Sequence, residues 1–282
     1  PIIAWDCKTS QEVMIILAIH HLPADNPMQS LLASHIGLKG NCFCQKCYAG
    51  GSQEFKQLNE GYDSLFKMGI KDSLADKYQK DLIAQRRMLE GEATASGKDA
   101  YTPETVAMIT QQQESWLSTQ KETIKPLLSD TPAEPLYTVL LGVIKYIWGI
   151  TCTAIGQTHQ LGLLETQLAS INTDGLGIPP LCATYLIQYC GGLIGRQFKA
   201  IMQTMTFALH DIVSGDILTV WKAAGKVGAL LWYPEIMDVE AYLTELSHEI
   251  DNLLDDMAIV DPSRIIQKPK FHILLHIVED IR

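Results

Sequence analysis

Lysine and arginine are absent from one long stretch of the sequence, between Pro234 and Asp261, where nine acidic residues occur. The whole chain has 22 basic and 32 acidic residues, so taking these nine away leaves 22 bases against 23 acids. The charge of −10 therefore belongs almost entirely to one segment. Charge alone excludes a polybasic protein that binds nucleic acids or membrane surfaces.

Aromatic residues are also scarce, at 7% of the chain, while alanine, leucine, isoleucine and methionine are plentiful. This balance favours helices over a β sandwich. The 47% of apolar residues beside 19% charged residues excludes a disordered chain. A length of 282 residues allows one large domain or two smaller ones.

No secretory signal and no basic targeting run is visible, and the seven cysteines are an odd number. A reduced, intracellular protein is expected rather than a disulfide framework. The chain begins at Pro1 without an initiator Met and stops at Arg282 without a helix stop signal. These two ends lead us to expect a fragment of a longer protein.

Strands are expected only near the N-terminus. The continuous apolar run 13–19 is rich in β-branched residues and suits a buried strand, although a short helix has the same pattern. The segment 37–52 carries four glycines and three cysteines and predicts an irregular loop. From about residue 53 the pattern is helical, with solvated helices expected over 73–91 and 104–125 and further helices over 193–209, 211–231, 236–259 and 270–282.

The segment 136–150 predicts the strongest core helix. Its apolar residues recur at the three-and-four spacing of one helix face: Leu136, Val139, Leu140, Val143, Ile144 and Ile147. Extended to Gly156, the segment is long enough to cross a membrane, but Lys145 lies in its centre. We expect a buried helix of a protein without a membrane span.

The acidic segment predicts an amphipathic helix. One face carries Val239, Leu243, Leu246, Ile250, Leu253 and Met257, and the acids fall mostly opposite. The acids are interpreted as a solvated face of a packed helix, and the alternative is a surface that contacts a basic partner.

The cysteines at 42, 44 and 47 point to a zinc site. Cys44 and Cys47 have the C-x-x-C spacing with which a tight turn binds one ion, and Cys42 and His35 lie just upstream. Because a second C-x-x-C pair is missing, three unrelated thiols in a loop remain the alternative.

Three further motifs were weighed, and each has a plainer interpretation. Asp25 follows an apolar run, where phosphoryl-transfer enzymes place a Mg²⁺ ligand, but Asp-Asn-Pro is also a good turn. His272 and His276 are one turn apart, yet without the Glu of H-E-x-x-H they are interpreted as packing histidines. Arg196 and Lys199 follow Gly191-Gly192 and are candidates for contact with a phosphate, but a glycine pair that breaks a helix is the plainer interpretation. No nucleophile elbow or local catalytic triad was found.

Five separated blocks carry a resemblance to a known group. They are Leu22–Ser30, Ala33–Gly37 with Asn41–Gly51, Leu140–Trp148, Gly191–Gly195 and Lys268–His276. In this order they resemble the transposon-derived proteins of mushroom-forming fungi that belong to the Plavaka and Kyakuja–Dileera–Zisupton group, related to CACTA-type elements. The similarity runs across essentially the whole chain.

The resemblance implies an RNase H-like transposase in which three carboxylates hold two Mg²⁺ ions for attack on a phosphodiester. Asp25 is where the family's second carboxylate is expected, and Cys42, Cys44 and Cys47, with His35, fall on its cysteine knuckle. The implied fold class is mainly α with a small N-terminal α/β part, a fragment of the RNase H-like core with a large helical insertion. The implied divisions are residues 1–52 for the core and knuckle, 53–130 for a polar helical segment, and 131–282 for the insertion.

Two of the family's three carboxylates would lie outside this chain, and a His near its Leu-Leu-Gly helix is replaced by Tyr137. We therefore expect a structural zinc ion, magnesium only if the site were complete, and no DNA cleavage by this chain alone. DNA as partner, self-association and a nuclear location follow from the resemblance, with Arg196 and Lys199 as the DNA-contacting candidates. The competing expectation is a non-catalytic, zinc-binding helical interaction module.

Overall fold

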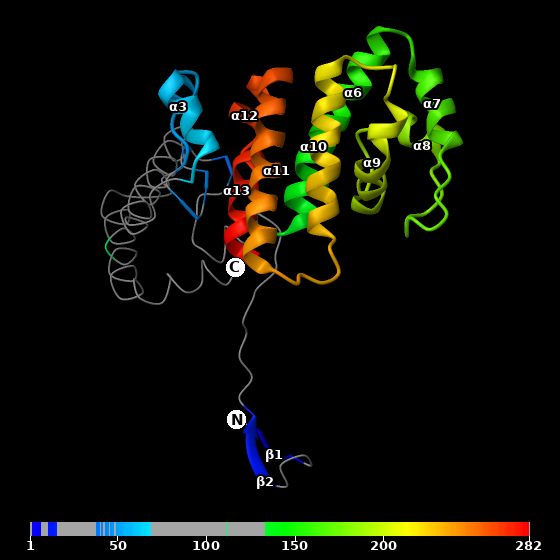
Figure 1. Ribbon diagram of the computed structural model, residues 1–282. Coiled ribbons are helices and arrows are strands. Elements are labelled where there is room, and N and C mark those ends of the chain that lie inside the picture. The colour runs from blue at the N-terminus through cyan, green and yellow to red at the C-terminus, as the bar shows by residue number, and fades with distance from the viewer. Residues whose placement is uncertain are drawn as a thin grey trace, which may run out of the picture.

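The computed structural model describes residues 38–68 except 40, 42, 45 and 48, residue 111, and residues 133–281. It also gives the backbone of residues 2–6 and 11–15. Within these ranges the protein is mainly helical, as the composition predicted (Figure 1). The helical segments predicted over 73–91 and 104–125 lie outside the described residues, apart from residue 111.

The two N-terminal strands form an antiparallel hairpin. Strand β1 (Ile2–Asp6) pairs with β2 (Gln11–Ile15), and the register places Ile2 opposite Ile15 and Asp6 opposite Gln11. The predicted strand 13–19 thus begins inside β2, and its remainder lies outside the described residues.

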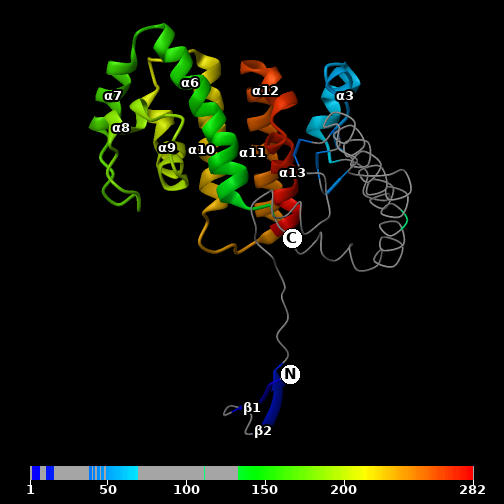
Figure 2. The same ribbon diagram turned by 180° about the vertical axis from the view of Figure 1, so that it is seen from behind.

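A short helical segment follows the cysteines. It consists of α2 (Gln53–Lys56), α3 (Asn59–Asp63) and one 3₁₀ turn, η1 (Ser64–Phe66). Ser52 begins α2, since its hydroxyl accepts a hydrogen bond from the Phe55 backbone N–H at 3.2 Å. This segment lies beside α12 and α13 in both views of the molecule (Figures 1 and 2).

The predicted core helix 136–150 exists, but its first part is wound differently from the prediction. Residues Leu136–Ile144 form a π-helix, η2, which continues without a break into α6 (Lys145–Gln157). At their junction the Lys145 N–H donates to the carbonyl of Leu140, five residues back, as a π-helix requires. The prediction placed Leu136 on the buried face, but Leu136 is 37% exposed and Thr138 is buried instead. A π-helix has more residues per turn than an α-helix, so it turns a different set of side chains toward the core.

The combined helix Leu136–Gln157 is long and apolar enough to cross a membrane by length and composition. Half of its most apolar window is buried inside the protein. Val143, Ile144 and Trp148 are fully buried. One such helix is weak evidence for a membrane span, because the core helix of a soluble protein passes the same test.

Four helices continue the chain and complete one side of the molecule: α7 (Leu161–Ser170), α8 (Ala183–Gln188), α9 (Gly195–Ala208) and α10 (Gly215–Leu231). The centre of this packing is a pair of buried indoles, Trp148 and Trp221, whose ring centroids are 6.5 Å apart in an edge-to-face arrangement. The Trp221 indole N–H donates to the Thr151 hydroxyl at 2.9 Å, so its polar atom is satisfied in the core.

The acidic helix α11 (Val239–Val260) is amphipathic as predicted. Its N-cap is Asp238, whose carboxylate accepts from the Ala241 N–H at 3.0 Å. The predicted apolar face is buried, apart from Val239 in the first turn, which is 44% exposed. One acid departs from the prediction of a solvated face. Glu249 is only 8% exposed and accepts from Lys226 of α10 at 2.9 Å, because α10 packs along this side of α11.

The chain ends with α12 (Pro262–Gln267) and α13 (Lys270–Ile281). Asp261 is the N-cap of α12 and Pro262 its first residue, where a missing N–H has no cost. Helix α13 packs against η2 and α11. It is therefore flanked by the main helical body on one side and by the α2–η1 segment on the other (Figures 1 and 2).

Candidate metal centre

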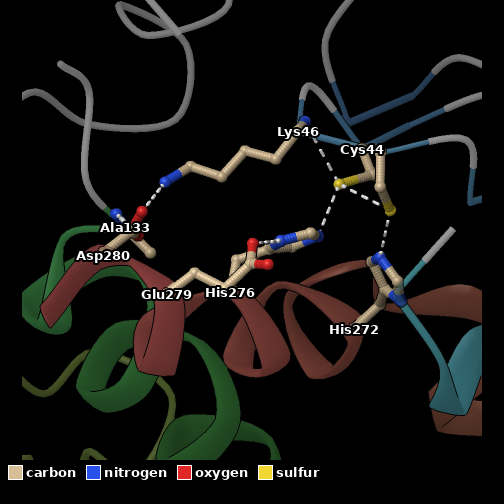
Figure 3. A network of polar contacts seen from close by, with 8 residues as sticks. Cys44, Lys46, Ala133, His272, His276, Glu279 and Asp280 are labelled. Carbon is tan, nitrogen blue, oxygen red and sulfur yellow. Dashed lines mark hydrogen bonds and ion pairs between the residues drawn. The ribbon is translucent and has the colours of Figure 1, made fainter. Parts of the chain in front are cut away.

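Two cysteines and two histidines from opposite ends of the chain meet beside α13 (Figure 3). Cys44 and Cys47 come from the loop before α2, and His272 and His276 come from adjacent turns of α13. All four side chains are buried, with at most 2% of their surface exposed. Polar side chains this deep need partners, and here they are each other's partners.

The distances between the four ligand atoms are short. Cys44 Sγ lies 3.2 Å from His276 Nε2, and Cys47 Sγ lies 3.2 Å from His272 Nε2. The two sulfur atoms are 3.6 Å apart. All four atoms lie within 4.8 Å of one another.

These distances resemble those of a tetrahedral metal site. With metal bonds of about 2.3 Å to sulfur and about 2.0 Å to nitrogen, a tetrahedron separates two sulfurs by about 3.8 Å and a sulfur from a nitrogen by about 3.6 Å. The three short separations are a few tenths of an ångström below these values, and no pair of the four atoms is more than 4.8 Å apart. Four nitrogen and sulfur ligands of this kind could hold a divalent metal ion.

The hydrogen bond of His272 orients its ring for ligation. Its Nδ1 lies 2.9 Å from the backbone carbonyl of Leu65, which can only accept, so Nδ1 carries the hydrogen. The lone pair is then on Nε2, the atom that faces Cys47. A ligating imidazole in proteins is commonly fixed by this kind of contact through its second nitrogen. The Leu65 carbonyl belongs to η1, so the α2–η1 segment contributes to the site without supplying a ligand.

His276 has a corresponding partner in a carboxylate. Its Nδ1 lies 3.4 Å from Glu279 Oε2, one turn further along α13 (Figure 3). This contact likewise leaves Nε2 free to face Cys44. A negative carboxylate behind an imidazole raises its basicity as a ligand.

The environment of Cys44 favours a thiolate. Burial raises the pKa of the thiol, but hydrogen bonds with Cys47 and with the two imidazoles outweigh that effect and hold the pKa well below its ordinary value of 9.0. The backbone N–H of Lys46 also donates to Cys44 Sγ, at 3.4 Å. A thiolate is the form in which cysteine binds a metal.

A buried ion pair flanks the cluster. Lys46 Nζ pairs with Asp280 Oδ1, and both side chains are about nine-tenths buried. The other carboxylate oxygen of Asp280 accepts from the Ala133 N–H at 2.6 Å. Asp280 therefore connects the cysteine loop to the chain that enters η2 (Figure 3).

The sequence prediction of a metal site was half complete. Cys44 and Cys47 are in the cluster, whereas the proposed ligands Cys42 and His35 lie outside the described residues, as does Asp25. His272 and His276, interpreted as packing histidines, are buried, but their Nε2 atoms also face the two thiols, a contact that the interpretation did not include. The sequence contained a signal for the complete site. The C-x-x-C motif supplies only two of four ligands, and the H-x-x-x-H motif supplies two more.

The two predicted phosphate contacts lie elsewhere. Arg196 is exposed in the first turn of α9, and Lys199 is half-buried with its Nζ 4.8 Å from the centroid of the Trp232 ring. Lys199 thus has an aromatic partner within the fold. Neither residue is a member of the cysteine and histidine cluster.

No protein-family model, no curated protein and no solved structure matches this chain.

Proposed function

We propose that Cys44, Cys47, His272 and His276 bind one zinc ion, and that this ion has a structural role. The observation that carries the proposal is the convergence of four buried ligand atoms within 4.8 Å of one another. Two thiolates and two neutral imidazoles suit zinc, and their two negative charges neutralise Zn²⁺. Hard cations such as Mg²⁺ prefer oxygen ligands, so this set disfavours them.

A structural role is supported by the closed ligand set. Catalytic zinc sites keep one position for water or substrate, whereas structural sites are filled by four protein ligands. Here four side chains are available and each is at most 2% exposed. Such a centre would join the cysteine loop to α13 across more than two hundred residues of sequence.

Such a link would add to the contacts that already join the segment between the cysteines and η1 to α12 and α13. Among the described residues these include the Lys46–Asp280 pair, the His272–Leu65 hydrogen bond, a bond from Lys56 Nζ to the Ile266 carbonyl at 3.4 Å, and an edge-to-face contact of the Phe43 and His272 rings. Metal binding that accompanies folding supplies about 10–16 kcal/mol in zinc-finger peptides, enough to hold a segment this small.

Metal analysis of the purified chain tests the proposal. We expect about one zinc per chain, lost in Cys44→Ser and in His276→Ala, because each removes one of four ligands. Cys182→Ser is the matched control, since Cys182 is an exposed cysteine outside the cluster. Zinc retained by both ligand variants, or lost equally in Cys182→Ser, would contradict the assignment.

We further propose that this zinc-binding protein derives from a transposase and that its ancestral partner is DNA. Two of the five blocks that carry the resemblance, Asn41–Gly51 and Lys268–His276, contain the four residues that meet in the cluster. In this proposal the N-terminal residues are part of an RNase H-like core, Asp25 is the carboxylate that this chain contributes to it, and the protein is nuclear. A non-catalytic helical interaction module is the competing possibility.

A DNA-binding and nicking assay with Mg²⁺ separates these possibilities. The proposal predicts binding to duplex DNA without cleavage, because one carboxylate cannot hold two metal ions against a phosphodiester. Cleavage that disappears in Asp25→Ala would show that the catalytic site is complete. Absence of any DNA binding would favour the interaction module, and it would leave the zinc proposal intact.

A further inference from the structure

Phe43 lies next to one metal ligand in the sequence and contacts another in the fold. It immediately precedes Cys44, and its side chain is buried. Its ring meets the imidazole of His272 edge to face, with the ring centroids 5.5 Å apart and the ring planes at 77°. An aromatic pair in this arrangement gains more than its buried area alone provides. Phe43 therefore links the cysteine loop to α13 without being a ligand itself.

The Phe43 ring is itself held from α2. Lys56 Nζ lies over the ring, 5.9 Å from its centroid, a distance at which an aromatic face attracts an ammonium group. The Lys56 side chain is buried, and its Nζ also donates to the carbonyl of Ile266 in α12 at 3.4 Å. Because this attraction is stronger away from water, the two contacts of Lys56 restrict the position of the ring.

The hydrogen bond of His272 does not by itself fix the plane of its imidazole. The torsion angle that turns an imidazole about its Cβ–Cγ bond has only a broad preference. The bond from Nδ1 to the Leu65 carbonyl constrains one direction within the ring plane, and rotation about that direction remains. Two neighbouring rings limit this rotation. They are Phe43 and His276, the second at 5.3 Å between centroids and 73° between planes.

The plane of the imidazole decides how well His272 can bind a metal. The lone pair of Nε2 lies in the ring plane, so a ring that rotates turns the lone pair away from the ion. Nε2 already faces Cys47 Sγ at 3.2 Å. Groups in a binding site need to stay within about 10–20° of the productive direction. Phe43 is not one of the four ligands, so its contribution to this alignment can be tested without removing a ligand.

We infer that Phe43 is a positioning residue of the zinc site. Its ring holds the imidazole plane of His272 toward the ion, and as an apolar group beside the ligands it keeps water from a fifth coordination position. This inference rests on the proposed zinc site, because a positioned imidazole has this role only where a metal binds. It gives His272 an aromatic support in addition to its hydrogen bond, whereas the support of His276 is the carboxylate of Glu279.

Three variants of the full chain test the inference. Phe43→Leu removes the ring and keeps an apolar side chain, whereas Phe43→Tyr keeps the ring. Phe198→Leu is the matched control, because Phe198 is a fully buried phenylalanine of α9 outside the cluster. Competition with a chromophoric chelator measures the zinc affinity. Co²⁺ in place of zinc reports the coordination geometry, because its visible absorption is strong with four tetrahedral ligands and weak with five or six.

We expect Phe43→Leu to bind zinc about tenfold more weakly, the lower end of the effect of losing a group that orients a ligand. Its Co²⁺ spectrum should lose intensity, because a freer imidazole lets water join the ion. Phe43→Tyr should keep the spectrum of the unmodified chain. Phe198→Leu should unfold at a lower temperature and leave zinc affinity and spectrum unchanged. If Phe43 only filled space in the core, Phe43→Leu would lose stability without a change in the spectrum.

Three results would overturn the inference: Phe43→Leu keeps either the Co²⁺ spectrum or the zinc affinity of the unmodified chain, Phe43→Tyr loses as much intensity as Phe43→Leu, or Phe198→Leu loses as much zinc affinity. Each of these leaves the zinc proposal intact, because the unmodified chain still binds zinc. A chain that binds neither zinc nor Co²⁺ overturns both. Should Phe43→Leu fail to fold by circular dichroism, Phe43→Met, with a flexible apolar side chain, provides the same comparison.

Discussion

Cys44 Sγ and His276 Nε2 lie 3.2 Å apart although 232 positions separate the two residues in the sequence. Cys47 and His272 repeat the relationship one helical turn away, also at 3.2 Å. A metal bound here would close a loop that contains almost all of the described helices. The cluster therefore links the cysteine loop to the last helix, and removal of the metal should weaken this link.

Chelation of the metal should loosen the cysteine loop and the α2–η1 segment more than the rest of the protein. We expect amide hydrogen exchange across residues 43–66 to become at least tenfold faster, equivalent to about 1.4 kcal/mol of local stability. Exchange in α9 and α10 should change little, because their core around Trp221 does not depend on the cluster. A uniform rise along the whole chain would contradict a local role for the metal.

The metal-free protein should show a pH dependence that Cys44 controls. Its folded pKa lies well below the unfolded value of 9.0, so between the two values the folded state binds fewer protons than the unfolded state. The stabilisation by the Cys44 thiolate is full above pH 9.0 and is lost as pH falls through the folded pKa. Thermal unfolding with a chelator present, compared between the unmodified chain and Cys44→Ser, measures it. The gap between their midpoints should widen as pH rises, and a gap independent of pH would contradict the prediction.

Glu279→Gln should weaken zinc binding without abolishing it. The carboxylate contacts His276 Nδ1 at 3.4 Å and raises the basicity of that ligand. Loss of such a partner typically costs 10–100-fold in metal affinity, and we expect about tenfold because this contact is long. Competition with a chromophoric chelator measures the change. Glu235→Gln, at an exposed carboxylate outside the cluster, should have no effect. Equal zinc affinities of the Glu279 variant and the unmodified chain would show that Glu279 does not support His276 as a ligand.

The Lys46–Asp280 pair should couple the cysteine loop to α13 independently of the metal. Asp280→Asn leaves a largely buried ammonium without its partner and should destabilise the protein by about 3 kcal/mol. Lys46→Met should have a similar cost, and the double variant should cost less than the sum of the two. Urea unfolding of the four proteins in the cycle gives the coupling energy. Strict additivity would show that the pair contributes nothing.

Two glycines in one continuous helix should respond to alanine in opposite ways. At Gly142 a Cβ would lie 2.6 Å from Lys270 Cδ and 2.9 Å from the Tyr137 carbonyl, so Gly142→Ala should destabilise by about 1–3 kcal/mol. At Gly149 nothing lies within 4 Å, so Gly149→Ala should stabilise by up to about 1 kcal/mol through helix propensity. Urea unfolding of both variants measures these changes. A stabilising Gly142→Ala would show that α13 does not approach η2 as closely as described.

Helices α9, α10, α11 and α13 were predicted because each has a local signature, whereas no helix was assigned specifically to α7, α8 or α12. The apolar face of α11 is visible in the spacing of Leu243, Leu246 and Ile250, and all three are buried. The burial of Glu249 was not predictable, because it depends on Lys226 in another helix. The π-helical winding of η2 was also missed, and with it the exposure of Leu136, because apolar spacing does not report the hydrogen bonds of the backbone.

Prediction of the metal centre was limited for the same reason, because its two pairs of ligands are distant in the sequence. The spacing of Cys44 and Cys47 indicated two ligands, because both come from one turn of chain. His272 and His276 have a spacing that suits an ordinary packed helix equally well, and only the fold brings their ring nitrogens to the thiols. A local pattern can predict half of such a site, whereas the pairing of its halves depends on tertiary structure.

X-ray absorption spectroscopy at the zinc edge of the purified full chain tests the central claim most directly. The Cys44, Cys47, His272 and His276 site predicts two sulfur neighbours at about 2.3 Å and two nitrogen neighbours at about 2.0–2.1 Å. A protein that folds without zinc, or a zinc shell of oxygen and nitrogen alone, would contradict it.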